Sequence, residues 1–321
     1  MNTAQAQLGA VLSAGGPSLT RLLERTEARL AEVAETHGAA LGVQAAGTLA
    51  AGGKRLRHVL VFLCGDGEDN RLVGAGAAVE LLHMATLVHD DVLDAAELRR
   101  GRPTVFAAAG RPAATATGDL LFSRAFAELA ATGSEDAVRA LSTASSALAH
   151  GELMQRADAW DENVAPERYL ERCRLKTASL VEASCRLGAV FGGRPDLAPA
   201  LGQFGERLGV AFQMLDDVLD VSGPAERTGK PRGADLLDGT VTLPLILARR
   251  QDPTLPGEVN TPQQAEAVCE RIAATGALDD ARRQAMAHVT AAKQALDGLQ
   301  LSEQRTNALQ LVADGVVARY A

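Results

Sequence analysis

The chain has 321 residues and a formal net charge of −8 at pH 7, and 47% of its residues are hydrophobic but only 3% aromatic. This balance is typical of packed helices and argues against a β-sandwich, which is enriched in β-branched and aromatic residues. The negative charge argues against general binding of nucleic acid. The four cysteines contain no CxxC pair, so we expect buried small side chains rather than a disulfide framework or a zinc site.

Neither a targeting signal nor a membrane span is expected. The amino-terminal stretch MNTAQAQLGAVLSAGG lacks the basic region of a signal peptide. The longest tempting apolar run, Val59–Cys64, falls far short of the roughly 18 residues that a transmembrane helix needs. We therefore expect a cytoplasmic protein.

Helical patterns follow one another from the start of the chain. Leucines and a valine at helical spacing predict an amphipathic opening helix over about 19–33. Ala- and Leu-rich segments predict further helices at about 74–95, 115–132, 136–156, 167–192 and 199–221. Glycine and proline predict breaks between them at 101–103, 110–112, 133–134 and 192–195.

Two polar segments follow these helices. Ser222–Ala234 is basic and rich in Gly and Pro, which predicts a mobile loop. Gln251–Asn260 is a connector, after which Thr261, Pro262 and Gln264 form the start signal of another helix. No alternating apolar run and no long linker is present. We therefore expect one all-α domain over 1–321, with C-terminal helices at about 261–321.

One acidic pattern occurs twice, as VHDDVLD at 88–94 and as MLDDVLD at 214–220. We call Asp90, Asp91 and Asp94 the first aspartate cluster, and Asp216, Asp217 and Asp220 the second aspartate cluster. Within each, the outer aspartates lie one helical turn apart on one face, beside apolar neighbours. Like charges at this spacing destabilise a helix, so a compensating cation is expected. Hard oxygen ligands favour Mg²⁺ over zinc.

The alternative for either cluster alone is a solvated acidic face. Two identical clusters with apolar flanks favour a site. Several Mg²⁺ ions with nearby Lys and Arg would turn the repulsion between carboxylates and a bound diphosphate into attraction. Such an arrangement suits the ionisation of a C–O bond, because charge develops on the departing diphosphate.

Basic and polar residues accompany the clusters in the sequence. Each taken alone has an ordinary explanation, because a helical His is more often structural and tandem arginines at a helix end are often solvated. Lys54 and Arg57, just after Gly52-Gly53, and Arg99-Arg100 beside the aspartates favour phosphate binding. The other residues that accompany the clusters are His83, Lys176, Thr177, Gln213 and Lys230.

The order of these segments resembles the trans-type polyprenyl synthetase family. The segments are GGKRLR, ELLHMATLVHDDVLD, LRRGRPT, KT, FQMLDDVLD and TGKPRGADLLDGTVTLP, and they cover about 52–244. The resemblance implies the isoprenoid synthase fold, a single-domain helical bundle around a central cavity. It also implies a homodimer that acts on isopentenyl diphosphate and an allylic diphosphate.

The resemblance also implies roles for the candidate residues. Both aspartate clusters would hold Mg²⁺ on the allylic diphosphate, which Arg99, Lys176 and Lys230 would also bind. Isopentenyl diphosphate would be bound by Lys54, Arg57, His83 and Arg100, while Thr177 and Gln213 would face the reacting carbons. Two residues depart from the family pattern: His58 stands where Pro is frequent, and Thr240 stands where Lys is frequent. One phosphate contact is therefore expected to be missing.

The expected reaction is ionisation, condensation and elimination. One alternative is an HD-type metal phosphohydrolase, suggested by His89-Asp90, but His150 and His288 lack the setting of further ligands. A terpene cyclase would not need the isopentenyl site that Lys54, Arg57 and Arg100 indicate. A non-catalytic subunit of a heteromeric synthase should have degraded aspartate clusters, and both clusters are intact.

Small residues below the first aspartate cluster bear on product length. Thr86 lies one turn below Asp90, Ala85 lies beside it, and Leu82 is a further turn down. In the family, a bulky aromatic residue at such positions stops growth at farnesyl or geranylgeranyl length. The small residues here predict a hexaprenyl or longer product. A short-chain synthase remains the alternative, because another helix could close the pocket.

Overall fold

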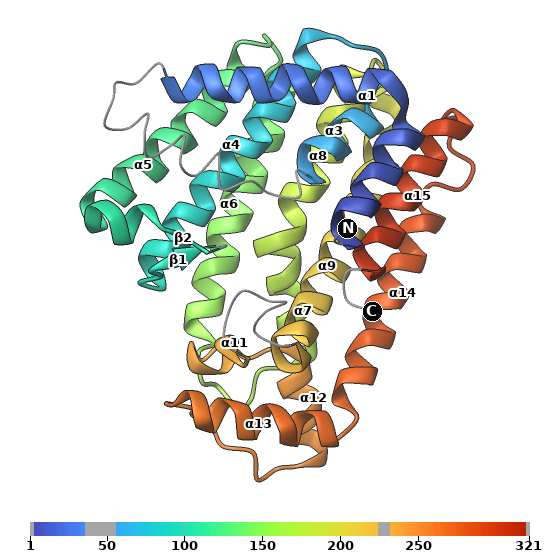
Figure 1. Cartoon of the computed structure of the whole chain (residues 1–321). Coiled ribbons are helices and arrows are strands. Elements are labelled where there is room, and N and C mark those ends of the chain that lie inside the picture. The colour runs from blue at the N-terminus through green and yellow to red at the C-terminus, as the bar shows by residue number, and fades with distance from the viewer. Residues whose placement is uncertain (1–2, 36–55, 100, 224–231, 319–321) are drawn as a thin grey trace. The chain divides into compact units, whose positions relative to one another are not determined.

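The computed structural model describes residues 3–35, 56–99, 101–223 and 232–318, and they are mostly helical (Figure 1). Within them the only strands are two-residue strands of one hairpin. The expectation of an all-α chain is confirmed. The chain divides into two compact units: unit 1 comprises 1–145, 180–202 and 298–312, and unit 2 comprises 146–179, 203–297 and 313–321. Lys54, Arg100 and Lys230 lie outside the described residues, as does most of the loop predicted over 222–234.

Unit 1 is built on two long neighbouring helices, α4 (Asn70–Leu93) and α5 (Val105–Ala130), which run side by side in Figure 1. Helices α1 (Thr3–Glu35) and α3 (Leu56–Cys64) pack on α4 and on each other. The unit also contains the first part of α6 (Glu135–Ala157), most of α8 (Ser179–Phe191), the 3₁₀ turn Pro195–Leu197, the start of α9 (Ala198–Ser222) and most of α15 (Glu303–Ala318). Its core includes Leu60, Leu72, Val79, Leu81, Leu121, Leu129 and Leu187.

Helix α4 is the core helix of unit 1. It begins after Asp69, whose carboxylate accepts a hydrogen bond from the backbone N–H of Arg71 at 2.8 Å and so caps the helix. Among the described helices, α4 alone is long and apolar enough to cross a membrane, but 67% of its apolar window is buried inside the protein. A buried core helix passes the same test, so this composition is weak evidence for a membrane span.

The break predicted at 110–112 was wrong because a glycine bends the helix there without ending it. Helix α5 begins at Val105 rather than near residue 115 and continues through Gly110, whose φ of 79° kinks it. Thr104 caps this helix by accepting from the N–H of Ala107 at 3.0 Å. The break predicted at 101–103 is the turn of a hairpin, in which β1 (Leu98–Arg99) pairs antiparallel with β2 (Arg102–Pro103).

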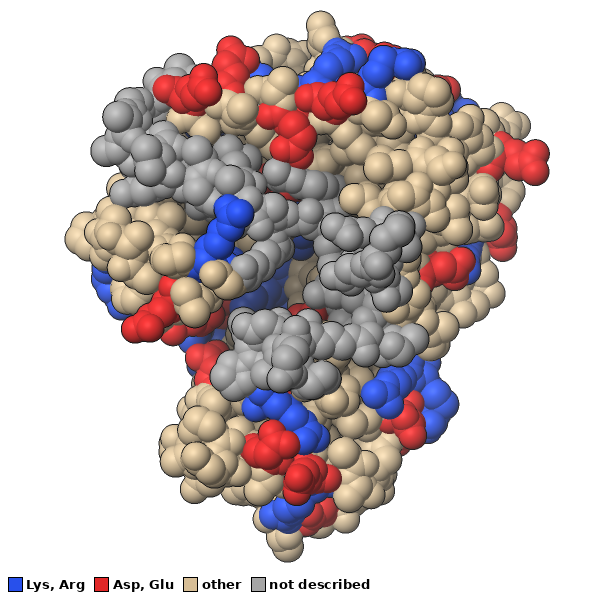
Figure 2. Space-filling model, in the orientation of Figure 1, with Lys and Arg blue, Asp and Glu red and all other residues tan. Residues whose placement is uncertain are grey.

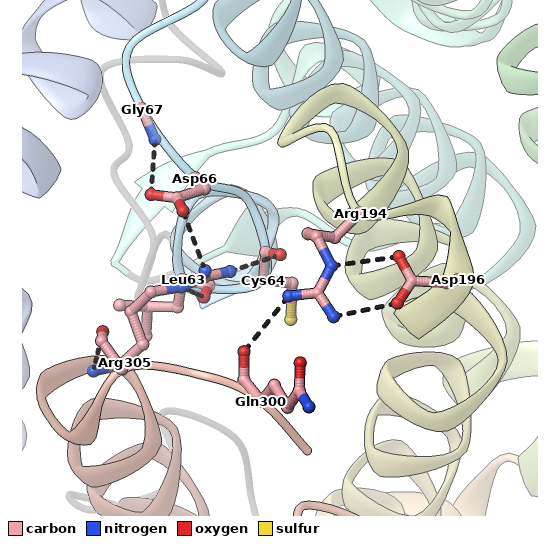
Figure 3. Close-up of polar contacts among 9 residues, drawn as sticks. Leu63, Cys64, Asp66, Gly67, Arg194, Asp196, Gln300 and Arg305 are labelled. Atoms are coloured by element: carbon pink, nitrogen blue, oxygen red, sulfur yellow. Dashed lines mark hydrogen bonds and ion pairs between the residues drawn. The ribbon is translucent and has the colours of Figure 1, made fainter.

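Arg305 closes the carboxyl end of α3, and Arg194 joins two neighbouring segments of the same unit, as Figure 3 shows. Arg305 of α15 donates to the carbonyl oxygens of Leu63 and Cys64, at 3.1 and 2.7 Å. The last carbonyls of a helix lack partners within the helix, so a cation that binds them stabilises the helix end. Arg194 donates to Asp196 and to the carbonyl oxygen of Gln300, at 3.2 Å for the latter, and so fixes the approach to α15.

Unit 2 contains the rest of α6 and α9, together with α7 (Pro166–Cys173), the π-helix η1 (Arg174–Ala178), α11 (Ala234–Leu237), α12 (Leu243–Gln251), α13 (Pro262–Ala274) and α14 (Ala277–Gln294). Helix α12 packs on α7, α13 and α14. The predicted start of α13 is confirmed, because Thr261 accepts from the N–H of Gln264 and Pro262 is the first helical residue. The core includes Phe204, Leu208, Met214, Leu243, Ile272 and Val289.

All four cysteines lie within the described residues, and all four are buried and free. The expectation of small buried side chains is therefore confirmed. Basic and acidic side chains lie interspersed on the described surface that Figure 2 shows, and no broad basic face is seen there.

The π-helix interrupts what the sequence predicted as one helix over 167–192. Its wider turn carries Lys176 and Thr177. Two glycines pack against it. A Cβ on Gly151 of α6 would lie 2.5 Å from the backbone nitrogen of Lys176, and a Cβ on Gly209 of α9 would lie 2.6 Å from the Cα of Ala178. Both helices therefore approach the π turn more closely than any residue with a side chain allows.

Replacing Gly209 with Ala should consequently destabilise the protein. The added methyl group would meet backbone rather than the end of a flexible side chain, and such overpacking costs about 1–3 kcal/mol. Thermal unfolding should show a melting temperature several degrees lower. Gly9→Ala is the matched control, because a Cβ there meets nothing within 4 Å and Ala favours the helix. An unchanged melting temperature for Gly209→Ala would contradict the close approach.

Candidate active site

The candidate residues fall in both units. Unit 1 carries the first aspartate cluster with Arg57, His83 and Arg99, while unit 2 carries the second aspartate cluster with Lys176, Thr177 and Gln213. In unit 1 a hydrogen bond joins Arg99 to the first aspartate cluster, and in unit 2 hydrogen bonds join Thr177 and Gln213 to the second.

The first aspartate cluster lies at the carboxyl end of α4. Asp90 is half-buried, Asp91 is only 5% exposed, and Asp94 is the C-cap residue, whose N–H donates to the carbonyl of Asp90 at 2.9 Å. The last turn of α4 contains no basic residue. A helix carboxyl end bears partial negative charge, so carboxylates here raise the free energy of the helix and favour a bound cation.

The hairpin returns Arg99 to this cluster. Its Nε and Nη2 lie 2.8 and 2.7 Å from Oδ1 of Asp91. This ion pair compensates the buried carboxylate, which would be costly without a partner. Asp91 and Arg99 were both predicted as site residues, and the structure places them in direct contact.

The other predicted residues of unit 1 lie along α4 and α3. His83 is half-buried, and its carbonyl accepts from the Thr86 hydroxyl at 2.7 Å. Leu82 and Ala85 are fully buried. Arg57 lies at the start of α3, half-buried. His58, next to it, is fully buried with Nδ1 3.3 Å from Oε2 of Glu80, so the helix accommodates this departure from the family pattern.

The second aspartate cluster occupies the last two turns of α9, which also lack a basic residue in the final turn. Asp216 and Asp220 are half-buried, whereas Asp217 is only 3% exposed. Burial raises the pKa of the Asp217 carboxyl, and the negative charges of Asp235 and Asp216 raise it further. Carboxylates crowded at a helix carboxyl end again favour a cation.

Neutral donors surround Asp217. The Tyr169 hydroxyl donates to its Oδ2 at 2.7 Å, and the Gln213 amide donates to its Oδ1 at 2.7 Å. The carbonyl oxygen of the same Gln213 accepts from the Thr177 hydroxyl at 2.7 Å. Thr177 and Gln213, predicted to act together, are therefore in contact.

Lys176 projects from the π turn toward α6, where its ammonium pairs with Glu152. Arg156 also donates to Glu152, at 2.9 Å. Burial opposes ionisation of Glu152, but the charges of Lys176 and Arg156 prevail and lower its pKa. Glu152 thus orients the Lys176 side chain.

The turn around α11 completes the surroundings of the second aspartate cluster. The backbone N–H of Asp235 lies 3.2 Å from Oδ2 of Asp220 and donates to it. Thr240 donates its N–H to the carbonyl of Asp235 at 2.8 Å, and its hydroxyl lies 3.2 Å from Oδ2 of Asp238. Thr240 is buried, so it stabilises this turn.

Three residues of this site were missed from the sequence: Tyr169, Glu152 and Asp235. Tyr169 precedes Lys176 by two helical turns, and Asp235 lies inside the segment TGKPRGADLLDGTVTLP, so both offered a weak signal. Glu152 offered no signal, because its role depends on the packing of α6 against the π turn.

The donor set fits Mg²⁺ held on a diphosphate. Among the described residues no three His, Cys, Asp or Glu side chains gather closely enough to hold a metal ion by themselves. Mg²⁺ is usually bound by one or two carboxylates together with substrate phosphates rather than by an all-protein cage. Half-buried aspartates at two helix carboxyl ends match this requirement. The HD-type alternative is disfavoured, because His89 contacts Asp119 at 3.2 Å and the described residues bring no further histidine to it.

Comparison with known proteins identifies the family. Residues 41–275 match the polyprenyl synthetase family. Heptaprenyl diphosphate synthase component 2 of Geobacillus stearothermophilus is 38% identical over 88% of this chain and 91% of its own length. Geranylgeranyl diphosphate synthase of Methanosarcina mazei is 35% identical over 84% of this chain and 86% of its own length.

A solved structure agrees with this match. The polyprenyl synthase of Caulobacter crescentus, complexed with calcium and isoprenyl diphosphate, superposes with a TM-score of 0.87 at 33% identity and covers 98% of each chain. The chain therefore belongs to the polyprenyl synthetase family of trans-prenyltransferases and has the all-α isoprenoid synthase fold.

Proposed function

We propose that this prenyltransferase condenses isopentenyl diphosphate with an allylic diphosphate and releases a longer trans-polyprenyl diphosphate. The observation that carries the proposal is the repeated arrangement of aspartates at the carboxyl ends of α4 and α9, each without a basic residue in the last turn. Two sites of concentrated negative charge suit a metal-bound diphosphate and have no evident structural purpose.

The candidate residues would bind the metal and the two substrates as follows. Both aspartate clusters would hold Mg²⁺, which supplies positive charge to the departing diphosphate. Arg99, Lys176 and Lys230 would bind the allylic diphosphate. Isopentenyl diphosphate would be bound by Lys54, Arg57, His83 and Arg100.

The contacts of unit 2 support the proposed role of two neutral residues. The Thr177 hydroxyl and the Gln213 amide are oriented by hydrogen bonds, so their dipoles can face the cationic carbon without reorganising. After the isopentenyl double bond attacks that carbon, the proton would leave to the released pyrophosphate. No side-chain nucleophile is needed.

The partner proposal has two candidates. We propose that the chain forms a homodimer, as the family resemblance implies. We also propose that residues 1–321 form a single domain and that the protein is cytoplasmic. The relative from Geobacillus stearothermophilus is named as component 2, which favours a second candidate: a complex with a different subunit. Size measurement of the purified chain, alone and after co-expression with its genomic neighbours, distinguishes the two.

The product length is also proposed rather than fixed by the family. The small residues Ala85 and Thr86 favour a hexaprenyl or longer product, and the Geobacillus stearothermophilus relative is named for a heptaprenyl product. The relative from Methanosarcina mazei is named for a geranylgeranyl product, which supports the short-chain alternative.

Activity should depend on a divalent metal and on both clusters. EDTA should abolish incorporation of labelled isopentenyl diphosphate, and Mg²⁺ should restore it. Asp90→Ala and Asp216→Ala should each lower kcat/KM by about 10³-fold or more, because each removes charge that binds the metal on the diphosphate. Asp136→Ala is the control, because Asp136 is an exposed aspartate on α6. Near-normal turnover in either cluster variant would refute the two-cluster proposal.

Bulky side chains below the first aspartate cluster should shorten the product. Ala85→Phe combined with Thr86→Tyr places two rings about five residues, or roughly 7.5 Å, along α4 from Asp90. Chromatographic sizing should show markedly shorter chains than wild type. Ala85→Ser, which adds one atom, should leave product length unchanged. A wild type that already stops at farnesyl or geranylgeranyl length would contradict the long-chain proposal.

A further inference from the structure

Tyr169 stands at one end of a series of hydrogen bonds that joins α7, α9 and the π turn. The series runs from the Tyr169 hydroxyl to Asp217, from the Gln213 amide to the same Asp217, and from the Thr177 hydroxyl to Gln213, with each distance 2.7 Å. Tyr169 and Asp217 are 1% and 3% exposed. Water is therefore a poor substitute for any of these donors.

The donors and acceptors of the series have one consistent direction. The Gln213 Nε2 donates to Oδ1 of Asp217, and the Gln213 Oε1 accepts from the Thr177 hydroxyl, so the amide is held in one orientation. The orientation of Thr177 in the π turn thus depends on Gln213, which in turn depends on Asp217 of α9.

The ring of Tyr169 is itself held in place. The guanidinium of Arg172 lies over it, 5.5 Å from the ring centroid, and donates to the carbonyl of Val241. Arg172 also pairs with Asp158 at 3.3 Å. The hydroxyl is consequently directed at Asp217 by contacts that a Phe at position 169 would keep.

Asp217 differs from its neighbours in the second aspartate cluster. Both of its oxygens accept hydrogen bonds from neutral protein donors, and its side chain is buried, whereas Asp216 and Asp220 are half-buried. A buried carboxylate with both oxygens engaged is suited to anchoring the helix end rather than to holding a metal ion directly.

We propose that Tyr169 is a positioning residue: its hydroxyl fixes the Asp217 carboxyl group as an anchor, which orients Gln213 and Thr177 and holds Asp216 and Asp220 in place for a metal-bound diphosphate. The proposal rests on the proposed function, because the ligand is the diphosphate of that reaction. It changes the expected role of Asp217 from metal ligand to anchor.

The test compares Tyr169→Phe with wild type in the full chain. Calorimetric titration with pyrophosphate in excess Mg²⁺ should show affinity about tenfold or more weaker in the variant, as is usual when a supporting hydrogen bond behind a metal site is lost. The KM for isopentenyl diphosphate should stay unchanged while kcat falls. The melting temperature should drop only a few degrees, because the ring is retained.

Ser184→Ala is the matched control. Ser184 is a fully buried hydroxyl that donates to the carbonyl of Leu180 at 2.7 Å, in unit 1. Its loss should lower the melting temperature by a similar amount and leave pyrophosphate binding unchanged. Equal pyrophosphate affinity in Tyr169→Phe and wild type would overturn the proposal and leave Tyr169 a purely structural residue.

A double variant tests the coupling. In Asp217→Asn, Gln213 can turn its carbonyl oxygen toward the new amide, and the Thr177 hydroxyl then accepts instead of donating. The acceptor that orients Gln213 and Thr177 is already lost in this background, so Tyr169→Phe should weaken pyrophosphate binding much less there. The same loss in both backgrounds would contradict the proposal. If the single variant Tyr169→Phe does not fold, the double variant should fold. A double variant that also fails to fold would count against the proposal.

The proposed function is judged separately. Wild-type turnover of isopentenyl diphosphate with an allylic primer tests the function, whereas the difference between the variants tests Tyr169. A wild type that turns over, with variants that bind pyrophosphate equally well, overturns the inference alone. A wild type that neither turns over nor binds pyrophosphate with Mg²⁺ overturns both.

Discussion

Repulsion between carboxylates at helix carboxyl ends is the constraint on which the site depends. α4 and α9 each end in an aspartate cluster, with no basic residue in the last turn, so helix dipole and side-chain charge oppose folding in the same place. Each unit contains this repulsion by fixing one buried carboxylate: Arg99 pairs with Asp91, and Tyr169 and Gln213 donate to Asp217. In the proposed reaction, Mg²⁺ and a diphosphate would compensate the remaining charge.

Close helix packing brings Lys176 and Thr177 of the π turn into contact with their partners on neighbouring helices. Gly151 and Gly209 let two helices approach the π turn, and that approach allows Thr177 to reach Gln213 and Lys176 to reach Glu152. Lys176, Thr177 and Gln213 thus lie on helices rather than on loops. In the proposed reaction, this preorganisation would stabilise a short-lived cation, because groups that must reorient during reaction contribute less.

Much of this arrangement could be predicted from local sequence. The i,i+4 spacing of Asp90 and Asp94 and the apolar periodicity around them depend only on neighbouring residues. The kink at Gly110 could not be predicted, because a Gly two residues before a Pro looks like a helix break in the sequence alone. The π turn and the contact between Tyr169 and Asp217 depend on segments far apart in the chain, and no local period reveals them.

The central claim is that both aspartate clusters act on one diphosphate. Electron paramagnetic resonance of Mn²⁺ in place of Mg²⁺, with a non-ionisable thio analogue of an allylic diphosphate, tests it most directly. The account predicts that the analogue recruits Mn²⁺ ions close enough for spin coupling, and that Asp90→Ala and Asp216→Ala each release bound Mn²⁺ and abolish the coupling. Mn²⁺ binding that is independent of the analogue, or unaffected by either substitution, would contradict it.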